Sequence, residues 1–278
     1  MSAPPETETE PETATGERVS VSIDGHIAEV VLNRPEKHNA LDFAMFEGIS
    51  NAIDEVAADP SVRAVVLRGE GKSFCSGLDI MSFANEGRDV QDMFARRPGE
   101  AANLAQRVAY GWQTMPAPVI AAVHGNCIGG GAQIALGADI RIIAPGSRVS
   151  IRETHWGLIP DMGITRSLPR LVRFDVAKEL VLTARILDAE EAVRVGLATR
   201  LDVDPVAAAR ALAAEIAERS PDATRRGKEL LERAWNQPAE ESLALEQELQ
   251  TELLGSPNQL KAVGAGMSGE PADFDDPA

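Results

Sequence analysis

Two glycine-marked loops constrain the fold and chemistry of this chain most strongly. The first reads Lys-Ser-Phe-Cys-Ser-Gly-Leu-Asp-Ile over residues 72–80, and the second reads His-Gly-Asn-Cys-Ile-Gly-Gly-Gly-Ala-Gln over 124–133. Glycine lets a backbone adopt conformations closed to other residues and pass close to a ligand. Two such loops can present backbone N–H groups to one developing negative oxygen. Glu153 and Asp161 follow downstream and could move protons beside that oxygen.

The pattern around these loops predicts an α/β core. Alternating residues over 19–23 and 27–32, around Asp24-Gly25, predict a hairpin. Asp42 is expected to cap the helix that follows. Helices are expected at 42–58, 101–114 and 132–137, strands at 62–67, 118–123 and 140–144, and a polar loop over 84–100. Further helices are expected at 176–183, 189–195, 206–219, 222–236 and 240–254. Strands that feed helices through glycine turns indicate a layered α/β fold, and the last third indicates a helical region.

Composition excludes several classes of function. The formal net charge of −16 argues against a nucleic-acid-binding surface, which needs a basic face. No apolar run approaches the roughly 18 residues of a membrane span, so no membrane partner is expected. The four histidines show no metal-binding spacing. Two cysteines without a CxxC pair favour a reduced, cytoplasmic protein.

The glycine run at 129–131 has two interpretations. It can be a tight connection between a strand and a helix. A helix that begins there would also point free N–H groups and its positive dipole end outward, where an enolate oxygen could bind. The Leu78 N–H, directly after Gly77, could supply a second donor.

Several motifs together resemble the crotonase (enoyl-CoA hydratase/isomerase) superfamily over roughly residues 18–255. They occur in the family's order at 33–41 (Asn-Arg-Pro-Glu-Lys-His-Asn-Ala-Leu), 74–80, 125–131, 157–160 (Gly-Leu-Ile-Pro) and 189–197. The resemblance implies an α/β fold, a spiral of ββα units with a C-terminal helical trimerisation region. The chain then divides into a disordered acidic tail at 1–17, a ββα spiral core at 18–200, a helical region at 201–263 and a loose tail at 264–278.

The resemblance also implies what binds and where. Family members act on acyl-CoA thioesters, so coenzyme A enters as part of the substrate and no other cofactor is expected. By position, the Leu78 and Gly130 N–H groups would polarise the thioester carbonyl and stabilise an enolate. Coenzyme A would lie along the segments that contain Arg34, Lys37, Ser76, Gly77, Asp79 and Ile80. The family's C-terminal helices assemble trimers or hexamers built as dimers of trimers.

Departures from the family pattern bear on the reaction. Typical hydratases carry a glutamate where this chain has Gln133, and a second glutamate that corresponds to Glu153. An amide can orient water but cannot exchange protons near neutral pH, so hydration should be weak or absent. The Glu153–Asp161 spacing resembles that of dienoyl-CoA isomerases, although those enzymes have an aspartate in place of Gln133. Asp161 could alternatively cap a helix after Pro160.

Three functions are weighed at this point, and other reactions of the superfamily, including thioester hydrolysis, decarboxylation and dehalogenation, also remain open. The favoured one is an enoyl-CoA or dienoyl-CoA double-bond isomerase, with Glu153 as the main acid/base, Asp161 as its proton partner and Gln133 in the site. The second is a weak hydratase in which Gln133 orients water for Glu153. The third is an acyl-CoA-binding protein without catalysis. The C-terminal segment 262–269 is small and glycine-rich, which puts the family's usual coenzyme A contact there in doubt.

Overall fold

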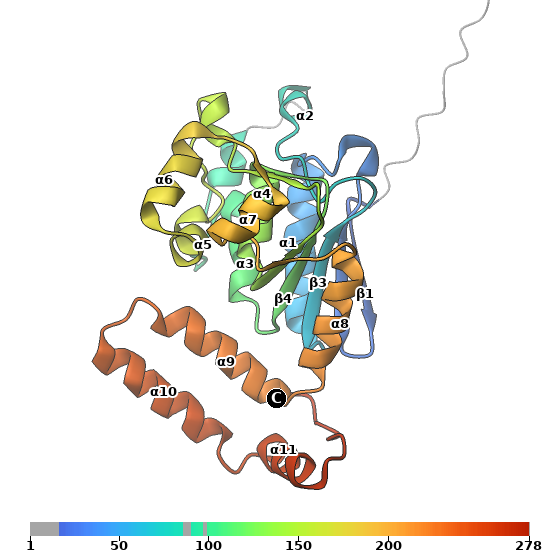
Figure 1. Ribbon diagram of the computed structural model, residues 1–278, viewed down its shortest axis with the longest axis vertical. Helices are drawn as coiled ribbons and strands as arrows, with labels where there is room; N and C mark the ends of the chain where they lie inside the picture. Colours follow the sequence, from blue (N-terminus) through green and yellow to red (C-terminus); the bar gives the residue numbers. More distant parts are fainter. Residues whose placement is uncertain (1–16, 86–89, 97–98, 278) are drawn as a thin grey trace, which may run out of the picture.

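Six strands form the main sheet of the computed structural model, which describes residues 17–85, 90–96 and 99–277. Their order across the sheet is β1-β2-β3-β4-β6-β9 (Figure 1). The strands are β1 (Val19–Asp24), β2 (Ile27–Leu32), β3 (Ala64–Gly69), β4 (Val119–Val123), β6 (Ile140–Ile143) and β9 (Arg200–Leu201). The β1–β2 pair is the expected antiparallel hairpin, and each later strand pairs in parallel. Parallel pairing sends the loops after β3 and β4 to the same edge of the sheet.

Helices cover both faces of this sheet because its strands alternate between two cores. One core packs beneath α1 (Phe43–Ala58), α3 (Leu104–Thr114) and α4 (Gly130–Gly137), and the other beneath α8 (Pro205–Ala217). In β3, Val65 and Leu67 point into the first core. Ala64 and Val66 point into the second, where α8 packs on them. The period of two is that of a strand buried on both faces.

A smaller sheet adjoins the glycine loops. It consists of β5 (Asn126–Ile128), β7 (Arg148–Ser150) and β8 (Leu187–Asp188), with β5 parallel to β7 and β8 antiparallel to it. The remaining elements outside the C-terminal region are η1 (Pro35–Lys37), α2 (Ile80–Asn85), η2 (Val90–Phe94), η3 (Glu153–Trp156), α5 (Ile164–Leu171), α6 (Phe174–Thr183) and α7 (Ala189–Val195). This sheet holds the second glycine loop against the chain that leads to Glu153.

The expected elements are largely found. Asp42 caps α1, and its side chain accepts a hydrogen bond of 2.8 Å from the Met45 N–H. The polar segment 84–100 contains the short helix η2, so it is not loop throughout. Residues 1–16, for which disorder was expected, lie outside the described residues, as do 86–89 and 97–98.

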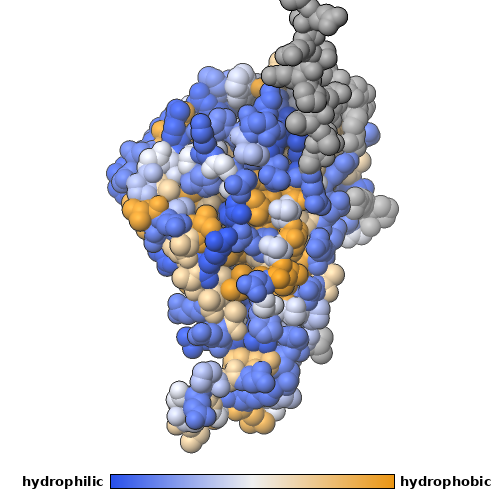
Figure 2. Space-filling view, turned by 90° about the vertical axis from the view of Figure 1, so that its right-hand side faces the viewer, coloured by the Kyte–Doolittle hydropathy of each residue, from blue (hydrophilic) through white to orange (hydrophobic). Residues whose placement is uncertain are grey.

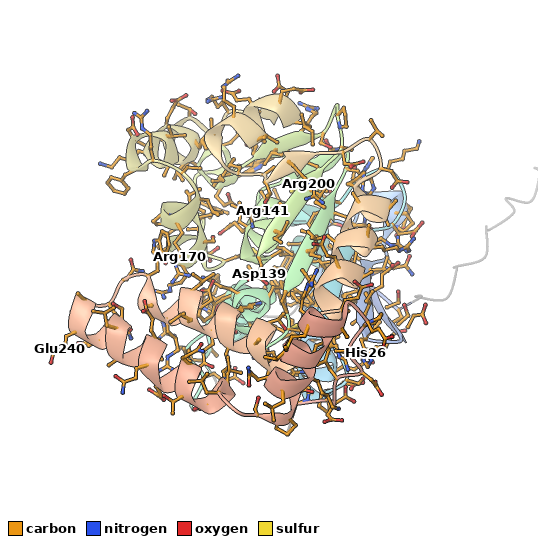
Figure 3. The ribbon with its side chains drawn as sticks, turned by 60° about the horizontal axis from the view of Figure 1, so that its bottom comes forward. His26, Asp139, Arg141, Arg170, Arg200 and Glu240 are labelled. Atoms are coloured by element: carbon orange, nitrogen blue, oxygen red, sulfur yellow. The ribbon has the colours of Figure 1, made fainter. Side chains whose placement is uncertain are left out.

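The C-terminal helices form an arm below the sheet (Figure 1). They are α9 (Pro221–Ala234), α10 (Ala239–Leu253) and α11 (Pro257–Ser268). Lys228 of α9 attaches the arm to the core, because its Nζ lies 2.7 Å from Asp139 Oδ2 and also donates to two backbone carbonyls. Asp139 and Arg170 face the arm from the core side (Figure 3), and Arg170 pairs with Glu232 of α9 at 2.5 Å.

The expectation of a loose tail from residue 264 is wrong. Helix α11 continues to Ser268, because Ser256 caps its start and Gly269 adopts the left-handed conformation that ends it. Beyond it, Phe274 is buried and its carbonyl accepts a hydrogen bond of 2.8 Å from Arg63 Nη2. The small residues of 262–269 gave no sign of this helix, because its N-cap, Ser256, lies before that segment.

Replacing Phe274 with alanine is expected to lower the free energy of unfolding by about 1.5–3 kcal/mol, the value of burying one large apolar side chain. Asp273, which is exposed, supplies the matched control, because surface changes usually stay within about 0.5 kcal/mol. Urea unfolding of the two alanine variants measures the difference. Equal midpoints would contradict the docking of the tail on the core.

Within the described residues, no helix is both long and apolar enough to cross a membrane.

Candidate active site

The two glycine loops lie side by side, joined by a short backbone ladder. Cys75 pairs with Cys127 in an isolated parallel bridge. The Cys75 N–H donates to the Asn126 carbonyl and the Ile128 N–H donates to the Cys75 carbonyl, both at 3.0 Å. A Cβ atom on Gly131 would lie 2.5 Å from the Cys75 carbonyl oxygen. Glycine at this position therefore allows the loops to approach each other this closely.

The Leu78 and Gly130 N–H groups come together at this contact. Gly77 has φ +89°, and a Cβ atom there would lie 2.7 Å from the Ile128 carbonyl oxygen and 3.7 Å from the Gly130 nitrogen. Within the described part of the chain, neither the Leu78 nor the Gly130 N–H has a backbone acceptor. Gly130 also begins α4, whose positive dipole end favours negative charge. Backbone N–H groups without an acceptor are the kind of donor that stabilises a developing oxyanion.

A buried ion pair supports the Leu78 segment from below. Leu41 holds the residues on both sides of Leu78. Its N–H donates to the Gly77 carbonyl, and its carbonyl accepts from the Asp79 N–H. Arg34 Nη1 lies 2.9 Å from Asp79 Oδ2, and Arg34 is 6% exposed. These charges are paired inside the protein, as buried charges must be.

Two residues of the segments expected along coenzyme A have their side chains engaged within the protein. The Arg34 guanidinium lies between Asp42 and Asp79, and Asp79 also accepts a hydrogen bond from the Ser82 hydroxyl, so both side chains support the loop. Lys37 and Ile80 are exposed beside the loop, and Ser76 is half-buried with its hydroxyl donating to the Lys37 carbonyl at 3.3 Å. Of the expected set, these three side chains remain accessible on the described surface.

Glu153 begins η3 and lies beside the second glycine loop. Its Oε1 is 3.3 Å from the place where a Cβ atom on Gly129 would lie. The same oxygen accepts a hydrogen bond of 2.7 Å from Gln133 Nε2. Its Oε2 is buried and has no hydrogen-bond partner among the described residues. A buried oxygen without a partner is uncommon and costly, and it marks a group available to a reacting proton.

Burial sets the protonation behaviour of the two carboxyl groups. It raises the pKa of Glu153, and the negative charge of Asp161 raises that pKa further, while the backbone N–H groups of Glu153 and Arg152 and the hydrogen bond from Gln133 oppose the rise. Burial also raises the pKa of Asp161. Carboxyl groups with raised pKa values can both take up and release protons nearer to neutral pH.

Asp161 is not a helix cap. Helix α5 begins at Ile164, with Gly163 as its N-cap and no side-chain cap hydrogen bond. The alternative interpretation of Asp161 is therefore wrong, and its carboxyl remains beside Glu153.

Gln133 is 1% exposed and both ends of its amide are engaged. Besides the bond to Glu153, its Oε1 accepts a hydrogen bond of 2.9 Å from the Met162 N–H. The sequence gives no sign of the Gln133–Met162 hydrogen bond. The two residues are 29 positions apart, and Met162 takes part through its backbone N–H, which every residue except proline carries.

Other candidate chemistries find less support. Burial raises the pKa of the Cys75 thiol to about 12, and raises that of Cys127 as well, so neither is a ready nucleophile. Among the described residues, no three His, Cys, Asp or Glu side chains gather in a way that could hold a metal ion.

A cavity of about 630 Å³ lies between α3 and α9, away from Glu153. Its Arg226 and Lys228 are already paired with Glu229 and Asp139.

Comparison with known proteins gives a consistent result. The sequence model of the family described as enoyl-CoA hydratase/isomerase matches residues 22–269. The chain is 34% identical over 260 residues to the mouse mitochondrial Delta(3,5)-Delta(2,4)-dienoyl-CoA isomerase, covering 88% of this chain and 78% of that protein. It is also 34% identical over 246 residues to the short-chain-enoyl-CoA hydratase of Clostridium acetobutylicum, covering 87% and 91%.

Solved structures agree with the sequence comparison. The enoyl-CoA hydratase of Bacillus anthracis superposes with a TM-score of 0.83 at 27% identity, covering 94% of this chain and all of that one. A putative enoyl-CoA hydratase of Streptomyces coelicolor superposes with a TM-score of 0.84 at 30% identity, covering 98% of this chain and all of that one.

Proposed function

The chain belongs to the enoyl-CoA hydratase/isomerase family, with the expected crotonase-like α/β fold, and from this premise we propose that it is an acyl-CoA double-bond isomerase. One observation carries the proposal. Glu153 is half-buried, its Oε2 is buried without a partner among the described residues, and its hydrogen-bonded neighbour is an amide that cannot exchange protons. A double-bond shift needs one group to remove a proton and return it, whereas hydration needs a water to be activated as well.

The proposed reaction begins with an enolate. The thioester carbonyl oxygen of a 3-enoyl-CoA accepts hydrogen bonds from the Leu78 and Gly130 N–H groups. Glu153 Oε2 takes a proton from C2, and the electron pair of that C–H bond moves toward the carbonyl oxygen. The dienolate then takes a proton at C4, the double bond settles between C2 and C3, and Glu153 is again ionised. No atom is gained or lost, and the negative charge that develops on the thioester oxygen is stabilised by the Leu78 and Gly130 N–H groups.

Asp161 extends the same chemistry to a longer conjugated system. With a 3,5-dienoyl-CoA, the proton leaves C2 and must return at C6, farther along the chain. A second carboxyl near Glu153 with a raised pKa could deliver that proton. The similarity to the mouse dienoyl-CoA isomerase supports this extension.

The proposal is tested by incubating the protein with 3-enoyl-CoA, 3,5-dienoyl-CoA and 2-enoyl-CoA, and following absorbance and products. A conjugated product from the first or second substrate is expected. Loss of the 2-enoyl chromophore with formation of 3-hydroxyacyl-CoA as the main reaction would favour a hydratase, which the similarity to the Clostridium enzyme keeps as the second candidate. Tight acyl-CoA binding with no turnover would favour a binding protein.

The rate should fall on the acid side at a pH above the ordinary glutamate value of 4.5. Glu153 must be ionised to take the C2 proton, and burial raises its pKa, so kcat is lost as the pH falls through that raised value. A pH profile of kcat for 3-enoyl-CoA measures this. A kcat that stays constant down to pH 4.5 would show that a different group is the base.

We also propose that the arm assembles the protein into trimers or dimers of trimers that bind acyl-CoA. The supporting observation is apolar surface on the described arm, where Leu231, Trp235, Leu243 and Leu254 are each at least 60% exposed. Hydrophobic residues also gather in the middle of the face shown in Figure 2, above the arm. Exposed apolar surface of this kind marks association sites, and light scattering gives the assembly size.

A further inference from the structure

We propose that Gln133 is a positioning residue that holds Glu153 with one carboxylate oxygen occupied and the other directed to the substrate. The proposal deepens the isomerase function and rests on it. Gln133 touches no reacting atom in this account, and it acts through Glu153.

The orientation of the Gln133 amide is determined by its neighbours. The Met162 N–H can only donate, so the side-chain group 2.9 Å away must be the amide oxygen. The NH₂ group therefore faces Glu153, and it donates to Oε1 at 2.7 Å. With 1% of Gln133 exposed, solvent does not compete for either bond. One side chain thus connects η3, which carries Glu153, to the backbone directly after Asp161.

This arrangement leaves Glu153 a single free oxygen. Oε1 is occupied by Gln133, while Oε2 is buried and has no partner among the described residues. The charge that acts on Glu153 is that of Asp161, and the Arg152 guanidinium donates to the Ala184 carbonyl at 2.5 Å instead of pairing with Glu153. A carboxylate fixed in this way presents the same oxygen to the carbon that loses a proton and to the carbon that gains one.

A carboxylate at position 133 would change the hydrogen bonding and the ionisation of Glu153. One of its oxygens could still accept from Met162, but the other would face Glu153 Oε1. Two acceptors cannot share that contact without a proton between them, and the second negative charge disfavours ionisation of Glu153. Gln133 thus favours ionisation of Glu153 and places no acid/base group of its own at position 133.

The test compares Gln133→Met and Gln133→Glu with the wild type in the full-length protein, using 3-enoyl-CoA. For Gln133→Met we expect kcat to fall about 10–100-fold with KM within about twofold, because a misplaced base costs rate more than binding. The acid limb of the pH profile should also move to higher pH, because the hydrogen bond that favours ionised Glu153 is lost. For Gln133→Glu the limb should move further in the same direction.

Gln113→Met is the matched control. Gln113 is also a buried helical glutamine that donates to a glutamate, with Nε2 2.6 Å from Glu232 Oε2, but it lies beside the arm. It should lose stability without a change in the pH profile. If the wild type is active but the acid limb of the pH profile does not move in Gln133→Glu, or in a folded Gln133→Met, the positioning role alone would be overturned. A wild type without isomerase turnover would overturn the proposed function and this inference with it.

Discussion

Replacing Glu153 with glutamine is expected to lower kcat for isomerisation of 3-enoyl-CoA by about 10²–10⁴-fold, the usual contribution of a positioned acid/base group. The amide keeps the size of the side chain but cannot accept the C2 proton. KM should change little, because glutamine has the size of Glu153 and the proposed oxyanion donors at Leu78 and Gly130 are left unchanged. Steady-state kinetics on the purified variant measures the loss.

The same substitution separates catalysis from folding. The pKa of Glu153 is raised in the folded protein, so its ionisation lowers stability as the pH rises from the ordinary value through the raised one. A neutral glutamine removes that penalty, and thermal stability at pH 7 should not fall. Glu190→Gln, at an exposed carboxyl on α7, is the control and should retain full activity. An active Glu153→Gln variant would remove Glu153 from the mechanism.

Replacing Gly77 with alanine is the second large effect, an expected loss of about 10²–10³-fold in kcat, as when one oxyanion donor is lost. A Cβ atom at this position would lie 2.7 Å from the Ile128 carbonyl oxygen, closer than real Cβ atoms approach. The two loops must separate to relieve that contact, which moves the Leu78 N–H away from the Gly130 N–H. The measurement is kcat on 3-enoyl-CoA, with circular dichroism to verify folding.

Gly146→Ala is a matched control for backbone strain. Gly146 has φ +78°, close to the φ +89° of Gly77, but no atom lies within 4 Å of its added Cβ. The Gly146→Ala variant should be less stable because of the unfavourable φ, but its kcat should equal that of the wild type. If both variants lose activity equally, the approach of the two loops would not be what the reaction requires.

The sequence predicted the local features of the site well. Gly77 and the glycine run at 129–131 indicated close backbone approach, and the structure confirms that the loops around them meet. Asp42 was correctly placed as the α1 cap, because a cap depends on residues three positions away. Features of this kind are encoded within a few residues and can be recognised without the rest of the fold.

Contacts between distant residues could not be predicted in the same way. Arg34 belongs to a segment that the family resemblance assigns to coenzyme A, yet it is buried with Asp79, 45 positions later. Sequence gives the charge of an arginine but not its burial or its partner. The docked tail was missed for a similar reason, since the Phe274 carbonyl accepts a hydrogen bond from Arg63, more than 200 residues earlier.

The central claim, that Glu153 removes a proton from C2 to form an enolate between the two loops, is tested most directly with a deuterium label. A 3-enoyl-CoA carrying deuterium at both C2 positions is converted by the protein, and the product is analysed by mass spectrometry. The account predicts a slower rate than with the unlabelled substrate and a 2-enoyl product that has lost one deuterium from C2. Equal rates for the labelled and unlabelled substrates, or no isomerised product at all, would contradict it.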